Sequence, residues 1–167
     1  MTKTEENLRA AFAGESQANR RYLAFAERAE REGYPEVSRL FRAAAESETV
    51  HALFHLRIMK EVKSTKENLE TAITGETYEY EKMYPEFIEV AQAEGNKAAV
   101  RSFSYAKDVE IGHAERYKEG LESVKDGRDL EPTDYFVCQI CGYIVAGETL
   151  ETCPICGSPR EKFKTIG

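Results

Sequence analysis

Two of the three histidines in this sequence of 167 residues follow a glutamate by three positions and precede an alanine. The two segments read ETVHA and EIGHA. Residues three apart on a helix lie on the same face, so Glu48 and His51 can hold one metal ion from a single helix. Glu110 and His113 can do the same from another helix. Carboxylate and imidazole ligands together favour iron or manganese over metals that prefer sulfur.

Further glutamates lie at related positions on other helical segments. Glu76 and Glu79 show the same spacing of three residues, and Glu15 lies within the apolar stripe of the first segment. An unpaired charge on an apolar stripe is costly, which favours a bound cation. Carboxylates that bridge allow two cations to lie close together. The candidate ligands of such a site are Glu15, Glu48, His51, Glu76, Glu79, Glu110 and His113.

A single Glu-x-x-His pair is weak evidence for a metal site. The chain is rich in glutamate, so one such pair can arise by chance. The recurrence of the pair at matching positions of an internal repeat is stronger evidence. The third histidine, His55, is interpreted as a packed or solvated side chain, because its repeat partner is Tyr117 and not a second histidine.

All four cysteines lie in two Cys-x-x-Cys pairs. Each pair can form a tight knuckle, and four thiolates make a tetrahedral metal site. In a reducing compartment this arrangement favours metal over disulfides. Zinc and iron both accept the geometry, so a structural zinc ribbon and a one-electron iron centre are both open. The candidate ligands are Cys138, Cys141, Cys153 and Cys156.

Four helical segments must position the glutamates and histidines. Residues 4–32 are rich in Ala, Glu, Arg and Leu, and their apolar residues recur at steps of three and four. A second helix follows the break at EGYPE. A third begins near residue 67, is interrupted at Gly75 and runs to Glu94, and a fourth ends near Lys125. Two tight turns and one longer middle connection predict a four-helix bundle.

An internal repeat supports this prediction. AFAGES at residues 11–16 resembles AITGET at residues 72–77, and AEREG resembles AQAEG. The two Glu-x-x-His-Ala segments are also equivalent. The offset between the copies grows by one residue from the start of the repeat to its later part, and the two halves look like copies of one helical hairpin.

The C-terminal part of the chain has a different character. Residues 126–134 are polar and contain Gly and Pro, as is typical of a linker. Aromatic and β-branched residues then alternate with Gly and Pro, which predicts a small β-rich module that needs a metal to fold. We therefore expect a mainly α protein with a helical domain at residues 1–128 and a four-cysteine domain at residues 133–167.

The charge and the apolar segments of the chain indicate which kinds of partner it can bind. The formal net charge of −7 argues against general nucleic-acid binding, which needs a basic face. The N-terminal segment lacks the apolar core of a secretory signal. No apolar run approaches the roughly 20 residues that span a bilayer. We expect a cytoplasmic protein with no nucleic-acid or membrane partner.

The order of these motifs resembles the rubrerythrin family, in which a ferritin-like four-helix bundle precedes a rubredoxin-like domain. The resemblance covers essentially the whole chain and rests on AFAGES, ETVHA, GETYEYEKMYP, EIGHA and two CxxCG knuckles. It implies that the Glu and His candidates hold two non-haem irons, bridged by carboxylates and an oxo group. It also implies that the cysteines hold a third iron, with zinc as the alternative.

The resemblance assigns roles to individual residues as well. Tyr22 and Tyr84 match tyrosines that form hydrogen bonds near the di-iron site. Glu79 is the additional carboxylate that separates this family from plain ferritin-like sites. One iron is expected to move between His51 and Glu79 when the redox state changes.

The function that the resemblance implies is the reduction of hydrogen peroxide to water, as a defence against oxidative stress. Electrons would come from rubredoxin or from an NAD(P)H-dependent reductase, since the chain has no glycine-rich dinucleotide motif of its own. They would pass through the cysteine-bound iron. The short linker favours transfer to the di-iron site of a neighbouring subunit.

Two other functions are open from sequence. One is ferroxidase activity or iron storage, although a fused electron-transfer module argues against it. The other is a structural zinc ribbon attached to a helical scaffold. We expect a homodimer. The stretch between His51 and Glu76 is short, which leaves open an exchange of helical hairpins between two chains.

Overall fold

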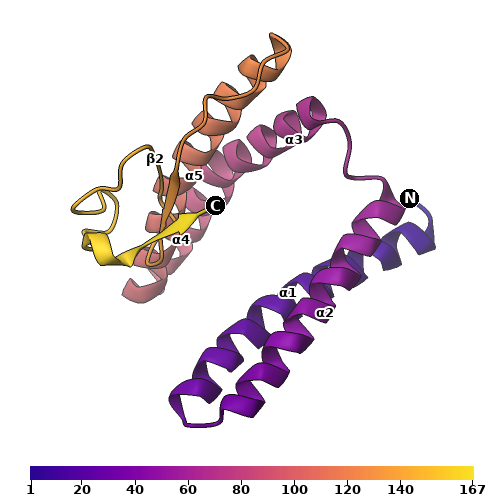
Figure 1. Cartoon of the computed structure of the whole chain (residues 1–167), viewed down its shortest axis with the longest axis vertical. Helices are drawn as coiled ribbons and strands as arrows, with labels where there is room; N and C mark the ends of the chain where they lie inside the picture. The colour runs from indigo at the N-terminus through magenta and orange to yellow at the C-terminus, as the bar shows by residue number, and fades with distance from the viewer. The chain divides into compact units, whose positions relative to one another are not determined.

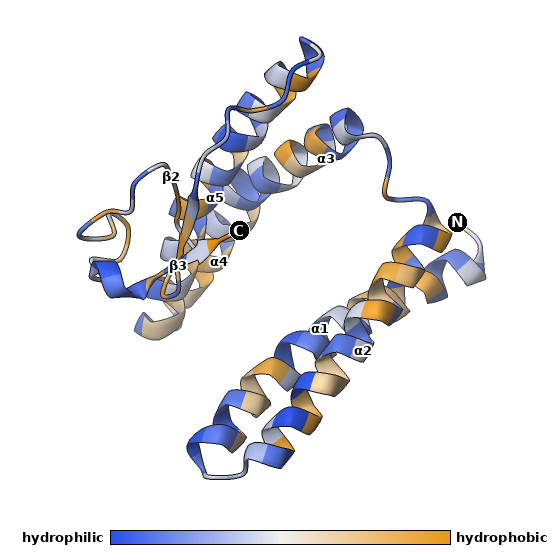
Figure 2. Ribbon diagram, viewed as in Figure 1, coloured by the Kyte–Doolittle hydropathy of each residue, from blue (hydrophilic) through white to orange (hydrophobic).

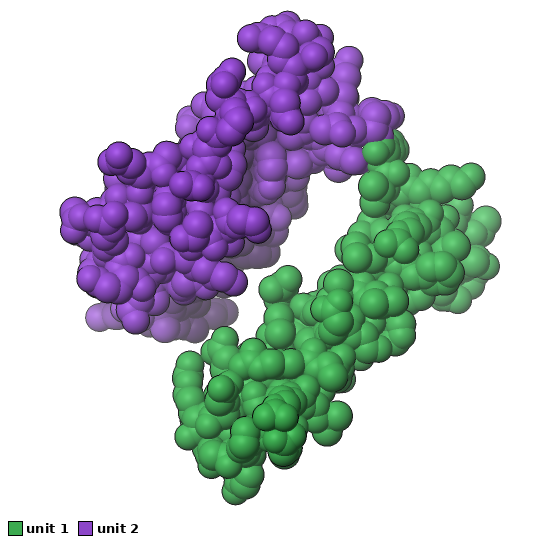
Figure 3. All heavy atoms as spheres, viewed as in Figure 1, with its two compact units in different colours: residues 1–63 green, residues 64–167 purple.

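The computed structural model describes all 167 residues, most of which are helical (Figure 1). The chain divides into two compact units, residues 1–63 and residues 64–167 (Figure 3). The helices of the first unit are α1 (Lys3–Arg31) and α2 (Pro35–Met59). Those of the second are α3 (Thr65–Tyr78), the π-helical segment η1 (Glu79–Met83), α4 (Tyr84–Ala93) and α5 (Lys97–Lys125).

In the first unit, α1 and α2 pack side by side as a hairpin (Figure 1). Thr2 caps α1, because its hydroxyl accepts a hydrogen bond from the Glu5 N–H at 3.2 Å and its own N–H donates to the Glu5 carboxylate at 2.6 Å. Gly33 supplies the left-handed φ of +84° that the turn requires, and Pro35 opens α2. Small buried residues lie on both helices, namely Ala26, Ala29, Ala45 and Ala52.

The second unit begins with a helix that is longer than the sequence predicts. Ser64 caps α3 through a capping box with Glu67. The interruption predicted at Gly75 was wrong, because α3 continues through that residue. One glycine costs a helix only about 1 kcal/mol relative to alanine, and packing of α3 on α5 offsets this cost.

The irregular turn of this helix lies instead at η1, a π-helical segment. Tyr22 and Tyr84 are one position further apart in the sequence than Glu15 and Glu76. The second half of the repeat therefore carries one additional residue between Glu76 and Tyr84, where η1 is found. A π-turn accommodates an additional residue while the helix continues on either side. Such turns are frequent at functional sites, and this one contains Glu79.

The C-terminal module is a small antiparallel sheet that packs on α5. Its strands are β1 (Tyr135–Cys138), β2 (Ile144–Ala146) and β3 (Phe163–Ile166), in the order β2-β1-β3, and a short 3-10 helix η2 (Arg160–Lys162) precedes β3. The Arg116 guanidinium on α5 donates a hydrogen bond to the Ile144 carbonyl at 3.1 Å. The prediction of four helical segments followed by a small β-rich module is confirmed.

Apolar residues recur along the helices but never fill a whole helix (Figure 2). None of the helices combines the length and the apolar character that a membrane span requires. The helices are therefore amphipathic.

Candidate metal centres

The first unit brings together one carboxylate of α1 with a carboxylate and an imidazole of α2. Ligand atoms of Glu15, Glu48 and His51 all lie within 4.8 Å of one another. His51 Nδ1 is 3.0 Å from Glu48 Oε2, as expected for residues three apart on a helix. The His51 side chain is 53 % exposed and the Glu48 side chain 18 %. This group contains three of the seven Glu and His ligands predicted from the sequence.

The second unit brings together the equivalent residues of α3 and α5. Ligand atoms of Glu76, Glu110 and His113 lie within 4.8 Å of one another. His113 Nδ1 is 2.6 Å from Glu110 Oε2 and 3.9 Å from Glu76 Oε2. Each of these side chains is at most 21 % exposed, so this group is less accessible to solvent than its counterpart.

Crowding of carboxylates perturbs the protonation of the second group. Burial, followed by the hydrogen bond and the charge of Glu110, raises the pKa of Glu76 to about 7. A hydrogen bond from His113 is the largest influence on Glu110 and lowers its pKa, while the same bond raises the pKa of His113. Below about pH 7, the metal-free carboxylates of Glu76 and Glu110 therefore share a proton. A divalent cation would replace that proton, so the donor set fits a carboxylate-bridged metal.

Glu79 lies beside this group but outside its 4.8 Å radius. Burial and then the charge of Glu110 raise the pKa of Glu79, so the two carboxyl groups interact electrostatically. The structure thus brings together six of the seven predicted Glu and His ligands in two groups of three, and leaves Glu79 adjacent to the second group.

Each half of the repeat also holds a cluster of three aromatic rings. Tyr22, Phe25 and Phe41 have ring centroids 5.6 to 6.3 Å apart. Their repeat equivalents, Tyr84, Phe87 and Phe103, have centroids 5.5 to 6.3 Å apart. The two clusters therefore match ring for ring. Sequence reasoning singled out the tyrosines and missed Phe25 and Phe87, although the repeat offset points to both.

The two tyrosine hydroxyls with perturbed pKa values both lie in the second unit. Burial and then the charges of Glu79, Glu110 and Glu76 raise the pKa of Tyr84. Burial and the charges of Glu76 and Glu110 raise the pKa of Tyr117 in the same way. Tyr117 was treated from sequence only as the residue that replaces a histidine in the repeat, so its place beside the carboxylates was missed.

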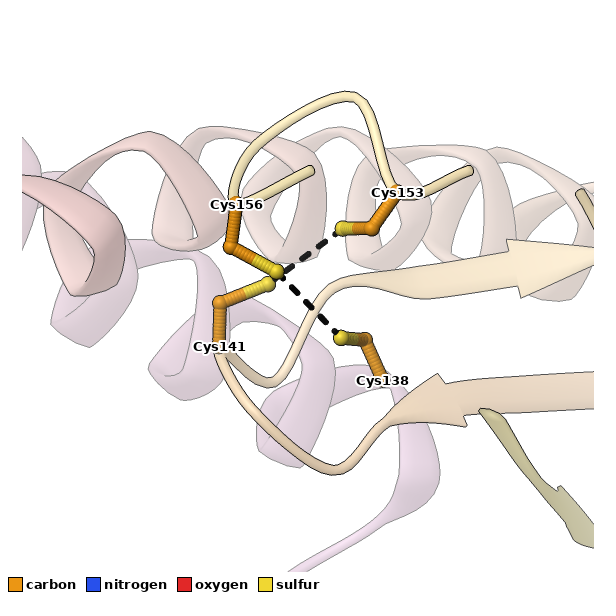
Figure 4. Close-up of side chains that lie close together, drawn as sticks. All are labelled: Cys138, Cys141, Cys153 and Cys156. Carbon is orange, nitrogen blue, oxygen red and sulfur yellow. Dashed lines mark hydrogen bonds between the residues drawn. The ribbon is translucent and has the colours of Figure 1, made fainter. Parts of the chain in front are cut away.

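The four cysteines form a third group (Figure 4). Their sulfur atoms lie within 4.8 Å of one another, with 3.6 Å between Cys138 and Cys156 and 3.5 Å between Cys141 and Cys153. All four are free of disulfides. Burial raises the pKa of Cys141 and of Cys153. Burial opposes ionisation of Cys156 too, but hydrogen bonds with Ser158 outweigh it and lower its pKa to about 7.

Both knuckles depend on a glycine just after the second cysteine. Gly142 has a φ of +88° and donates its N–H to the Cys138 carbonyl at 2.9 Å, and Gly157 has a φ of +73° and donates to the Cys153 carbonyl at 2.9 Å. The left-handed conformation favours glycine at both positions. Four converging sulfur atoms from two such knuckles form the tetrahedral site that iron or zinc accepts.

The cysteine group lies against the second Glu/His group. A Cβ atom on Gly142 would be 3.8 Å from the Val109 side chain of α5. His113 Nε2 is buried without a well-oriented hydrogen-bond partner, and the Gly142 backbone is the nearby group that contributes to raising the pKa of His113. A pocket of about 260 Å³ between α5 and the module is lined in part by His113, Arg116 and Tyr143.

This placement differs from one expectation drawn from the sequence. The short linker was expected to favour transfer from the cysteine site to a neighbouring subunit. The linker instead allows the module to fold back onto α5 of its own chain, where Val109 and Arg116 contact it. The residue after Cys141 therefore lies beside His113 of the same chain.

Comparison with known proteins decides the family. Residues 6–121 match the profile described as rubrerythrin, and residues 136–164 match the profile described as the rubredoxin-like domain of rubrerythrin. The chain belongs to the rubrerythrin family. Rubrerythrin-2 of Clostridium acetobutylicum is 38 % identical, with 98 % of this chain and 96 % of the relative aligned. Nigerythrin of Nitratidesulfovibrio vulgaris is 40 % identical, with 96 % of this chain and 85 % of the relative aligned.

A solved structure agrees with this assignment. Nigerythrin in its fully reduced, all-ferrous state matches with a TM-score of 0.58 at 38 % identity, covering 99 % of this chain and 88 % of that one. The predicted family and the ferritin-like fold with a rubredoxin-like domain are therefore confirmed. The predicted cofactors of this rubrerythrin are confirmed as well: a di-iron carboxylate centre of Glu and His residues, and a rubredoxin-like iron centre held by four cysteines.

Proposed function

We propose that this protein reduces hydrogen peroxide to water, with electrons delivered through the four-cysteine centre. The observation that carries the proposal is the contact between the two kinds of centre within one chain. Gly142, which follows a cysteine ligand, lies against α5 beside His113. A storage protein has no need of an electron-transfer module in contact with a di-iron ligand.

We assign the di-iron ligands to both halves of the repeat. The two groups of three residues occupy equivalent repeat positions, so each half supplies two carboxylates and one imidazole. Glu79 has no glutamate at the equivalent position of the first half, where residues 17 and 18 are Gln and Ala. It is therefore the residue that makes the site asymmetric, and we propose that it exchanges with His51 as a ligand.

The reaction takes up two electrons and two protons and converts one hydrogen peroxide into two waters. When bound, a ferrous pair supplies both electrons at once, which avoids release of hydroxyl radical. The residues supply position and protons. Burial and the charges of Glu79, Glu110 and Glu76 raise the pKa of the Tyr84 hydroxyl, so it keeps its proton beside these carboxylates. Cys138, Cys141, Cys153 and Cys156 would hold the iron that supplies these electrons one at a time.

Electrons enter from outside the chain in this proposal. The four-cysteine module presents partly exposed ligands, Cys141 and Cys156, and the side chain of Ile140 in the first knuckle is 55 % exposed. An apolar knuckle around a partly exposed iron site suits brief docking of rubredoxin or of an NAD(P)H-dependent reductase. We further propose a cytoplasmic homodimer that acts in defence against oxidative stress.

A variant of the four-cysteine site tests the electron route. In Cys141→Ser we expect steady-state consumption of peroxide with a reductase to be lost, while chemically reduced protein still consumes peroxide in a single turnover. Glu151→Gln, on the surface of the same module with its side chain 83 % exposed, is the matched control and should turn over at the wild-type rate. Full turnover of Cys141→Ser would rule out the relay.

The ferroxidase alternative makes a different prediction for the same samples. An iron-storage protein would oxidise and retain many irons per chain in air, without any reductant. The proposed peroxidase should retain only its bound cofactors under those conditions, as measured by iron analysis after gel filtration.

A further inference from the structure

We propose that the Ser158 hydroxyl raises the reduction potential of the cysteine-bound iron, because it donates a hydrogen bond to the Cys156 thiolate. Ser158 acts through a ligand and not on the iron itself, so it is a positioning residue of the four-cysteine centre. Its use in catalysis rests on the electron relay proposed above, whereas its effect on the potential can be measured without peroxide or a reductase.

The two cysteine knuckles share one backbone design. In the first, the Cys138 N–H donates a hydrogen bond to the Tyr143 carbonyl at 2.9 Å. In the second, the Cys153 N–H donates to the Ser158 carbonyl at 2.8 Å. Each knuckle also has a glycine between its second cysteine and this acceptor residue. Tyr143 and Ser158 therefore occupy equivalent positions, and a comparison of their side chains shows how the two knuckles differ.

The side chain at this position contacts a cysteine ligand in the second knuckle. Ser158 Oγ is 3.1 Å from Cys156 Sγ, which is within hydrogen-bond distance for an oxygen and a sulfur atom. Tyr143 carries its hydroxyl at the far end of its ring, and this side chain lines the pocket beside α5 instead. The Ser158 hydroxyl therefore distinguishes the environment of Cys156 from that of Cys141.

Metal binding determines the direction of this hydrogen bond. A cysteine that binds iron is a thiolate, which has no proton to donate. The Ser158 hydroxyl is then the donor of the pair, and the Cys156 sulfur is the acceptor. Hydrogen bonds with an ionised partner are stronger than those between neutral groups. Ser158 and Cys156 are both half-buried, so solvent competes only partly for this hydrogen bond.

Such a hydrogen bond stabilises the reduced iron more than the oxidised iron. Reduction adds one electron to the iron and its four thiolates and moves no atoms. The added negative charge spreads onto the sulfur atoms, which strengthens the hydrogen bonds that they accept. Hydrogen bonds to the sulfurs are among the influences that set the reduction potential of iron–sulfur centres. The Ser158 hydroxyl should therefore raise the potential.

A raised potential favours the uptake of electrons from outside the chain. In this step, rubredoxin or the reductase loses one electron and the cysteine-bound iron gains it. With Ser158 present, the four-cysteine centre accepts this electron more readily and releases it to the di-iron centre less readily. Ser158 thus shifts the balance between entry and exit of electrons toward entry.

Three variants separate the hydroxyl from the backbone of the knuckle. Ser158→Ala removes the hydroxyl, while the carbonyl at this position can still accept the hydrogen bond from the Cys153 N–H. Ser158→Thr retains a hydroxyl and should keep the potential of the wild type. Thr149→Val is the matched control, because Thr149 Oγ1 is a buried hydroxyl of the same module with no hydrogen-bond partner.

A redox titration of the iron-loaded proteins, followed by the visible absorption of the thiolate-bound iron, measures their potentials. At a fixed ambient potential, Ser158→Ala should show a ratio of ferrous to ferric iron about tenfold lower than the wild type. This ratio corresponds to a reduction potential about 59 mV lower. Ser158→Thr and Thr149→Val should show ratios within about twofold of the wild type.

Three results would overturn the role of Ser158. The first is a potential of Ser158→Ala equal to that of the wild type. The second is an equally low potential in Ser158→Thr, because that variant retains the hydroxyl. The third is loss of the cysteine-bound iron from Ser158→Ala, because the hydroxyl would then maintain the site and not set its potential.

The role of Ser158 and the proposed function fail in different ways. A lower potential in Ser158→Ala, together with wild-type protein that consumes no peroxide, would refute the relay and support the role of Ser158. An unchanged potential together with normal peroxide turnover would refute the role of Ser158 alone. If both proposals hold, stopped-flow absorption should show slower reduction of Ser158→Ala than of the wild type by the same donor.

Discussion

Replacement of Glu76 by glutamine should stabilise the metal-free protein, and more strongly as the pH rises. The folded structure raises the pKa of this carboxyl group from 4.5 to about 7, mainly by burial and by the neighbouring Glu110. A raised pKa means that the group favours folding fully below pH 4.5, and that this contribution is lost as the pH rises towards 7. Glutamine resembles the protonated acid at every pH, so the variant keeps this contribution to stability as the pH rises.

The size of the effect follows from the pKa and the exposure. A rise from 4.5 to about 7 corresponds to about 3 kcal/mol in the free energy of unfolding. Because the Glu76 side chain is 20 % exposed and solvent screens its charge, we expect about 1–2 kcal/mol. The stabilisation should be small at pH 4.5, grow with pH, and level off above pH 7.

Denaturant unfolding of chelator-treated protein at several pH values measures this difference. Glu110→Gln is the control of opposite sign, because a hydrogen bond from His113 lowers the pKa of Glu110. Glu110 stabilises the fold above its usual pKa and loses this contribution in acid, so Glu110→Gln should destabilise the protein at pH 8 and less so at low pH. A Glu76→Gln variant whose free energy of unfolding relative to wild type is the same at every pH would refute the reasoning.

Two other predictions concern the module and the π-turn. Arg116→Ala removes the hydrogen bond to the Ile144 carbonyl, which is worth about 1 kcal/mol. The variant should keep its iron content, but peroxide should reoxidise its cysteine-bound iron roughly fivefold more slowly. An unchanged rate in stopped-flow absorption would contradict the proposed docking of the module on α5. Deletion of Tyr80 from η1 should leave a regular α-helix and change the melting temperature by only about 4 °C. Deletion of Val50 from the regular helix α2 is the comparison. It should abolish cooperative thermal unfolding, because it rotates His51 away from Glu15. Equal effects of the two deletions would show that η1 does not accommodate an additional residue.

Local patterns in the sequence account for the helices and for the two groups of three ligands. Apolar residues at helical spacing place Glu48 and His51 on one face, and the repeat carries the same arrangement to Glu110 and His113. The Cys-x-x-Cys spacing likewise predicts the four converging sulfurs. Periodicity finds the residues that are close in sequence, such as Glu48 with His51 and each Cys-x-x-Cys pair, and the repeat indicates which further residues, such as Glu15 and Glu76, have equivalent positions.

Features that depend on packing between distant segments could not be predicted in this way. Gly75 resembled a helix break, but the packing of α3 on α5 outweighs its weak helix propensity. The offset between the two copies of the repeat increases by one residue, which indicates an additional residue in the second copy. Only the backbone shows that a π-turn at Glu79–Met83 accommodates this residue. The contact of Gly142 with Val109 joins a loop to a helix on the far side of the linker, and no local pattern records it.

The most direct test of the proposed function is a titration of iron-loaded, anaerobically reduced protein with hydrogen peroxide, followed by visible absorption. The thiolate-to-iron bands report oxidation of the four-cysteine site. If the centres are coupled, the bands should return promptly, with about one peroxide consumed for every two electrons removed. If the di-iron centre is oxidised while the cysteine-bound iron stays reduced, electron delivery through the module is contradicted, and ferroxidase chemistry becomes the better account.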